Sequence, residues 1–300
     1  MPYAHSIPYF APAERLPAPL PSIEEIEAGQ EMGPEKPIAG QRVVRVGQHF
    51  VVKHGWWVRP VEGLNMLYVS DHTTVAVPHV YAIYQQEDAE GRTCTYIVME
   101  YVDGRPLNEC WSSLDSEVKE TISSQLRGVL DQLRKLPPPS SDEDDDDYAP
   151  VFKSVDNGPL HDGLFWTEGE EVPEVNGPFR TEGDIAEALV RKLELEGSDF
   201  KPERASYYRR VLPHVLRGDG KPTFTHADLQ TKNIMLRPDG VLVLLDWEWA
   251  GWYPRYWEYS IAVFGCGFWV DDFHAWVPKF LDEYPNEYLW LATIRGFLWY

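Results

Sequence analysis

The 300-residue sequence has few cysteines, which argues against a disulfide-stabilised fold and against a cysteine metal site. Its three cysteines, Cys94, Cys110 and Cys266, are odd in number and widely spaced. They provide neither a disulfide framework nor a Cys-x-x-Cys metal site. A reducing compartment is therefore expected.

Basic residues are also scarce relative to acidic ones. Lys and Arg total 27 against 48 Asp and Glu, which gives a formal net charge of -21. A long phosphate backbone would be repelled by this field, so nucleic acid is not an expected partner. The same excess favours a cationic small molecule.

Long hydrophobic runs are missing too. The longest apolar stretch, residues 260–270, is too short to cross a bilayer of roughly 30 Å as a helix. The first residues lack the basic flank and apolar centre of a signal sequence and contain several prolines. We therefore expect a cytoplasmic protein without a membrane partner, and its 43% hydrophobic content is ample for a folded core.

The first third of the chain predicts a small antiparallel sheet. Residues 1–37 are proline-rich and aperiodic, which indicates an arm that lies extended on the domain or is disordered. Within residues 38–103, β-branched residues on both sides of a turn at Gly47 predict a hairpin, and a helix is expected after Pro60. The segments "VPHVYAIYQQ" and "CTYIVMEYVDG" predict two further strands.

Residues 104–300 predict a mainly helical lobe. Apolar residues from Val118 to Leu136 recur every three or four positions, and Thr181 with Asp184 forms the capping box of a later helix. Residues 137–180 form an irregular insertion whose acidic run, 141–147, is typical of a solvated loop. Two short strands are expected around the turn "RPDG". The fold class is therefore α+β.

The segment "FTHADLQTKNIML" and the following "LLDWEWAGW" contain the most informative polar residues. Asp228 lies on a loop before a strand, Asn233 ends that loop, and Asp246 follows the next strand. Such hard oxygen ligands suit Mg²⁺, which shares phosphate oxygens and so implies a nucleotide. A carboxylate not needed by the metal can orient a hydroxyl nucleophile. Each residue could instead cap a turn, whereas a zinc site lacks a second His at ligand spacing.

In order and spacing, these motifs resemble the aminoglycoside phosphotransferase and choline kinase-like family, in the manner of its fungal members. The resemblance extends over residues 40–265 and includes "FVVKHG", "YIVMEYVDGRPL", "HADLQTKN", "LLDWEWAGWYP" and "WEY". It implies a bilobal protein-kinase-like fold with a small N-terminal sheet lobe and a larger helical lobe. It also implies ATP and Mg²⁺ as cofactors.

The resemblance assigns a role to each matching residue. Asp228 is the implied catalytic base, and His226 is expected to orient its loop by hydrogen bonding rather than to carry protons. Asn233 and Asp246 are the implied magnesium ligands, while Lys53 contacts the α and β phosphates and pairs with Glu62. The implied hinge for the adenine edge comprises Met99, Glu100, Tyr101 and Val102.

Two departures from the protein-kinase pattern affect the phosphate and metal contacts. The loop "RVGQHF" lacks G-x-G-x-x-G, so Gly47 offers only a modest backbone cradle. Asp246-Trp247-Glu248 replaces Asp-Phe-Gly and resembles the Asp-x-Glu of choline kinases. Glu248 is then either a further metal ligand or a substrate contact.

We therefore expect a small-molecule kinase that transfers the γ-phosphate of ATP to a hydroxyl group. No protein partner is evident, and no activation segment suited to peptide substrates follows Asp246. A nucleotide-binding pseudokinase that acts as a scaffold is the alternative. An aromatic cage for a cationic acceptor is a further hypothesis, although such rings more often fill a core; its residues are Trp252, Tyr253, Trp257 and Tyr259.

Overall fold

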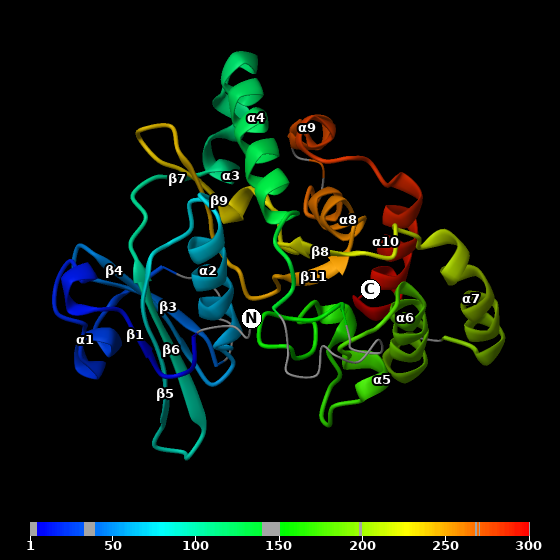
Figure 1. The fold of residues 1–300 in the computed structure, drawn as a ribbon, viewed down its shortest axis with the longest axis horizontal. Coiled ribbons are helices and arrows are strands. Elements are labelled where there is room, and N and C mark those ends of the chain that lie inside the picture. Colours follow the sequence, from blue (N-terminus) through cyan, green and yellow to red (C-terminus); the bar gives the residue numbers. More distant parts are fainter. Residues whose placement is uncertain are drawn as a thin grey trace. The chain divides into compact units, whose positions relative to one another are not determined.

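The computed structural model describes residues 5–32, 40–139, 151–197, 200–267, 269 and 271–299 (Figure 1). The chain divides into two compact units. The sheet unit comprises Ala4–Gly104 and Met235–Glu248, and the helical unit comprises Arg105–Ile234 and Trp249–Tyr300. Among the described residues, no helix combines the length and apolar character that crossing a membrane requires.

The sheet unit is built on a six-stranded sheet in the order β1-β5-β6-β4-β3-β2 (Figure 1). All five neighbouring pairs are antiparallel. The hairpin expected around Gly47 and the two strands expected after it are confirmed. The strands are β1 (Tyr9–Phe10), β2 (Gln30–Glu31), β3 (Arg42–Val46), β4 (Phe50–Gly55), β5 (Val80–Glu87) and β6 (Thr93–Glu100).

The proline-rich beginning of the chain forms part of the sheet unit. It supplies β1 and β2, and between them a 3-10 helix, η1 (Ala13–Arg15), and the short helix α1 (Ile23–Glu27). Ile26 of α1 is fully buried against Val44 and Val52 of the sheet. Within residues 5–32 the segment therefore lies on the domain, whereas residues 33–37 of the expected arm fall outside the described residues.

Helix α2 (Val61–His72) follows Pro60. The helix expected after Pro60 is confirmed, and every residue from Val61 to Val69 is buried, so this part of the helix is enclosed on all sides. Gly63 fits this packing because a Cβ there would lie 2.5 Å from Cδ1 of Ile83. This glycine therefore allows α2 to approach the sheet closely.

A hairpin from late in the sequence also belongs to the sheet unit. Its strands are β9 (Ile234–Leu236) and β10 (Leu242–Leu244). The Leu244 N–H donates to the Ala76 carbonyl at 3.2 Å, and Arg237 forms an ion pair with Glu100 at 2.8 Å. Residues 104–300 were expected to form the helical lobe, but contiguity along the chain does not determine which unit a hairpin packs with.

The helical unit carries most of the remaining elements. The capping box of Thr181 and Asp184 is confirmed at the start of α6, and α7 extends two residues beyond Pro213. The elements are β7 (Arg105–Pro106), α3 (Leu107–Cys110), η2 (Trp111–Ser113), α4 (Ser116–Leu133), η3 (Gly163–Phe165), α5 (Pro173–Asn176), α6 (Glu182–Glu196), α7 (Pro202–Val215), β8 (Pro222–Thr225), η4 (Thr231–Asn233), β11 (Gly251–Pro254), α8 (Trp257–Phe264), α9 (Phe273–Phe280) and α10 (Pro285–Trp299).

The irregular insertion is partly core. Phe152, Leu164 and Phe165 are buried in a hydrophobic core cluster of the helical unit. Asp162 is also fully buried, where it pairs with Arg295 of α10 at 2.7 Å. The acidic run 141–147 lies outside the described residues.

Candidate active site

The sheet unit gathers a lysine and three carboxylates. Side chains alternate along β4, so Val52 packs in the cluster that includes Ile26 while Lys53 faces the opposite side, where α2 presents Glu62. Lys53 Nζ lies 2.7 Å from Glu62 Oε2, 2.9 Å from Asp246 Oδ1 and 3.1 Å from Glu248 Oε2. The structure thus brings together four residues that the sequence analysis assigned to phosphate and metal binding.

This cluster contains one ammonium group and three carboxyl groups, so negative charge exceeds positive charge. Lys53 and Glu62 are 4% and 2% exposed, so water screens their pair little. Burial opposes the charge on Lys53, but the three carboxylates outweigh it and hold the pKa of the ammonium well above its ordinary value. Burial raises the pKa of the Glu62 carboxyl above its ordinary value. Repulsion from Asp246 and Glu248 adds to this rise, whereas the attraction of Lys53 opposes it.

Asp246 and Glu248 are held in place by the tryptophan between them. Trp247 is fully buried, its indole N–H donates to the Leu244 carbonyl at 2.8 Å, and its own carbonyl accepts from Asn65 Nδ2 at 2.9 Å. The residues on either side are therefore turned toward Lys53. Asp246 has a positive φ of 63°, a conformation that costs a non-glycine residue free energy and is enriched at functional sites.

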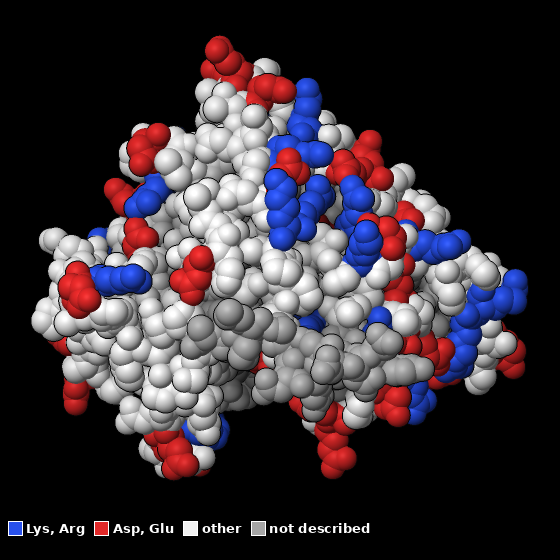
Figure 2. Space-filling view, in the orientation of Figure 1, with Lys and Arg blue, Asp and Glu red and all other residues white. Residues whose placement is uncertain are grey.

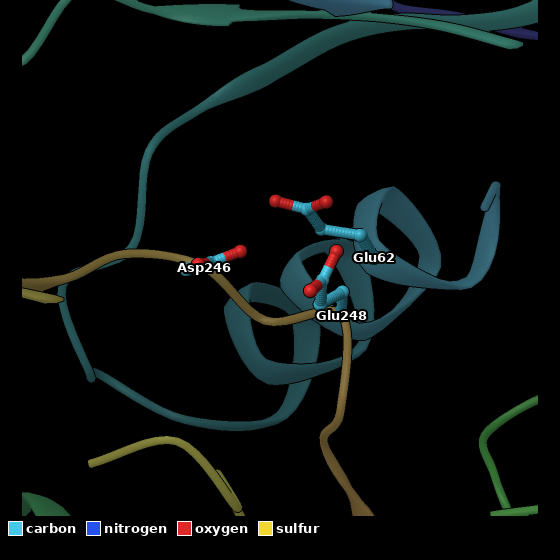
Figure 3. Close-up of side chains that lie close together, drawn as sticks. All are labelled: Glu62, Asp246 and Glu248. Atoms are coloured by element: carbon cyan, nitrogen blue, oxygen red, sulfur yellow. The ribbon is translucent and has the colours of Figure 1, made fainter. Parts of the chain in front are cut away.

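The carboxylates of Glu62, Asp246 and Glu248 point toward a common space (Figure 3). Each offers an oxygen within 4.8 Å of the others. Hard oxygen donors with excess negative charge fit Mg²⁺, and Asp246 and Glu248 are partly exposed whereas Glu62 is buried with Lys53. Asp246 and Glu248 are thus the residues of this unit best suited to hold the metal.

The expected phosphate loop and hinge lie on two neighbouring strands of the same sheet. Gly47 occupies the turn between β3 and β4 with a φ of 63°. Met99 and Glu100 end β6, and the Tyr101 N–H donates to the His49 carbonyl at 2.8 Å. The Arg45 guanidinium lies over the Tyr101 ring at 3.7 Å. Val102 is buried directly after these residues.

The helical unit holds a second cluster, centred on Asp228. Asn233 Nδ2 donates to Asp228 Oδ2 at 2.7 Å and to the Asp228 carbonyl at 2.9 Å. This leaves the amide oxygen of Asn233 as the atom suited to a metal. His226 is fully buried, and its Nδ1 accepts the Asp228 N–H at 3.2 Å, which is a loop-orienting bond.

Glu258 fixes the same loop and was not singled out by the sequence analysis. Its carboxylate accepts the N–H groups of His226 at 2.7 Å and Ala227 at 3.3 Å, and Ala227 has a positive φ of 63°. Burial raises the pKa of Glu258 to about 7 despite these two bonds. The "WEY" motif was the available signal, but a motif does not reveal which backbone atoms a side chain reaches.

Glu258 predicts a pH dependence of stability. Its pKa is about 7 in the folded chain against an ordinary 4.5, so the folded state binds an extra proton between these values. Stability should fall by about 3 kcal/mol as pH rises through this window, and Glu258→Gln should remove that slope. Urea unfolding of both proteins from pH 4.5 to 7.5 measures the difference. Parallel curves would contradict the assignment.

The four aromatic residues proposed as a cage are core residues, which corrects that hypothesis. Trp252, Tyr253 and Trp257 are fully buried, and Tyr259 is 7% exposed. The Trp252 indole donates to the Leu136 carbonyl at 3.0 Å, and the Trp257 indole donates to Asp162 at 3.0 Å. Strand β11 pairs with β8 and draws the first two into the interior.

Comparisons with known proteins identify the family of the chain and the structures that it resembles. The sequence matches the phosphotransferase enzyme family (APH) over residues 62–299, while no curated protein sequence matches it. Among solved structures, a thermostable mutant of aminoglycoside phosphotransferase APH(4)-Ia in complex with ADP and hygromycin B has a TM-score of 0.56 at 15% identity, covering 91% of this chain and 87% of that one. The GDP and kanamycin complex of APH(2")-IIia has a TM-score of 0.54 at 14% identity, covering 88% and 82%.

At these identities the similar structures establish the fold alone, and they confirm the expected α+β, protein-kinase-like class. The sequence match establishes the family, because it spans most of the chain and includes both the Lys53 partner Glu62 and the Asp228 loop. This protein is a member of the phosphotransferase enzyme family.

Proposed function

We propose that the protein transfers the γ-phosphate of ATP, with Mg²⁺, to a hydroxyl group of a small molecule. The observation that carries the proposal is the Lys53 cluster, in which one buried ammonium is surrounded by three carboxylates. Such a group neutralises phosphate charge without reorganisation, and partly exposed carboxylates beside it suit a metal. A purely structural ion pair needs one carboxylate rather than three.

In this proposal both clusters serve one reaction. The acceptor oxygen attacks the γ-phosphorus, the bond from that phosphorus to the β-γ bridging oxygen breaks, and ADP leaves. Asp228 orients the acceptor hydroxyl and receives its proton late in the transfer. Bound Mg²⁺ would neutralise phosphate charge, with Asp246 and Glu248 as its ligands in the sheet unit, and the Asn233 amide oxygen is the atom of the Asp228 cluster suited to a metal. Lys53 contacts the α and β phosphates, and residues 99–102 contact the base.

The charge distribution supports a small-molecule acceptor over nucleic acid. On the face shown in Figure 2, Lys and Arg side chains lie among Asp and Glu side chains. In the helical unit, for example, Arg127 pairs with Asp131 and Asp282, and Arg255 also pairs with Asp282. With a net charge of -21, the protein favours a cationic acceptor. The kanamycin and hygromycin B complexes show that related folds accept small molecules.

Magnesium-dependent stabilisation by ATP tests the proposal. At about 100 times its dissociation constant, a ligand selective for the folded state adds about 2.7 kcal/mol of stability. We expect ATP to raise the melting temperature more with Mg²⁺ than without it, and Asp246→Asn to lose the magnesium-dependent part.

Asp239→Asn is the matched control, since Asp239 lies in the exposed turn of the β9–β10 hairpin, which directly precedes Asp246. It should behave as the unaltered protein does. Absence of any shift with ATP would overturn the proposed function, and an equal shift with and without Mg²⁺ would overturn the metal assignment.

A further inference from the structure

The carboxylate of Asp228 is held by two amides. Asn233 Nδ2 donates to Oδ2, and Gln230 Nε2 donates to Oδ1. An ionised carboxylate only accepts hydrogen bonds, so each amide must present its NH₂ group. Lys232 lies farther away, with Nζ 3.7 Å from Oδ2, and its exposed side chain adds little constraint.

The side chain of Gln230 packs directly against Gly265. Gly265 follows the last residue of α8, and a Cβ built on it would lie 2.5 Å from Gln230 Cγ and 3.2 Å from Cδ. The φ of Gly265 is -67°, which any residue adopts, so the backbone does not require glycine at this position. The requirement is space for the Gln230 side chain.

We propose that Gln230, seated against Gly265, is a positioning residue that fixes the orientation of the Asp228 carboxylate toward the acceptor hydroxyl. The inference rests on the proposed function. The χ2 torsion of an aspartate is broad, so the carboxylate plane would turn readily if only Oδ2 were held. With both oxygens bonded, the plane of the carboxylate is fixed.

Residues at the two ends of helix α8 then both support the Asp228 loop. Glu258, near the start of the helix, binds the backbone before Asp228, and Gly265, just past its end, accommodates the side chain that binds the carboxylate. Backbone and side-chain orientation of the loop are thus set by one element. Gly265 would be read from sequence as an ordinary helix-ending residue.

A double-mutant cycle tests the inference with the full-length protein. Gly265→Ala should lower kcat about tenfold, the effect of losing one hydrogen bond to a charged group, and leave the KM for Mg-ATP within about twofold. Gln230→Ala should do the same. In the Gln230→Ala background, Gly265→Ala should add no further loss, because the clashing Cγ is gone.

Two more variants separate positioning from folding. Gln230→Met keeps the bulk beside Gly265 but has no N–H, so it should lose the same factor in kcat at an unchanged melting temperature. Gly128→Ala in α4 is the control, since nothing lies within 4 Å of its added Cβ, and it should retain full activity.

Losses that multiply in the double variant, or a fully active Gln230→Met, would overturn the inference. A loss of kcat that appears only where the melting temperature falls would show a structural role and would also overturn it. If the unaltered protein transfers no phosphate in the assay that measures kcat, the proposed function fails as well. That outcome is distinguishable, because it is seen in the unaltered protein before any variant is compared.

Discussion

Asp228→Asn is expected to reduce phosphoryl transfer by about 10³-fold, the usual contribution of a positioned general base. The replacement keeps the shape of the side chain and can still accept a bond from Asn233, so the loop should keep its conformation. The lost property is the ability to take the acceptor proton. Single-turnover transfer from labelled ATP measures the effect.

Nucleotide binding provides the internal control for this variant. Because Lys53, Glu62, Asp246 and Glu248 belong to the other unit, Mg-ATP should stabilise Asp228→Asn as much as it stabilises the unaltered protein. Asp219→Asn, at an exposed position of the helical unit, should transfer phosphate normally. Transfer by Asp228→Asn at the parental rate would show that another group is the base.

Lys53→Met is expected to abolish Mg-ATP binding and to lower the free energy of unfolding by about 3 kcal/mol. Removing one member of a buried ion pair leaves an uncompensated charge, and Glu62 is 2% exposed. The carboxylates of Asp246 and Glu248 would also lose their cation. Urea unfolding and nucleotide titration measure the two effects.

The double variant Lys53→Met with Glu62→Gln separates stability from binding. It removes both buried charges, so most of the lost stability should return. Mg-ATP binding should not return, because the ammonium that contacts phosphate is still missing. Binding by the double variant would contradict the role assigned to Lys53, and unchanged stability in the single variant would contradict the buried pair.

Local patterns predicted the central strands of the sheet unit, and family resemblance pointed to its cluster of charged residues. Alternating β-branched residues gave β3 and β4, and the order of "FVVKHG", Glu62 and "LLDWEW" pointed to Lys53, Asp246 and Glu248. The strand predictions are confirmed because β3 with β4, and β5 with β6, are hairpin neighbours with short loops, whose register follows from turn geometry. The interaction of Asp246 with Lys53, 193 positions earlier, came from family resemblance and not from periodicity.

The missed features all depend on contacts between distant segments. Strands β8 and β11 pair without a connecting hairpin, so no local pattern predicted the pairing that buries Trp252 and Tyr253. The strands β1 and β2 contain two residues each, too few to show an alternating pattern. Gln230 and Gly265 are 35 positions apart, and their contact follows from the packing of α8.

The most direct test of the account is to incubate the protein with Mg-ATP and a panel of hydroxylated amines and sugars, and to identify phosphorylated acceptor by mass spectrometry. We expect product from at least one acceptor with the unaltered protein and none above background with Asp228→Asn, although both bind Mg-ATP. Product from both proteins alike, or tight Mg-ATP binding without product from any hydroxyl acceptor, would contradict it.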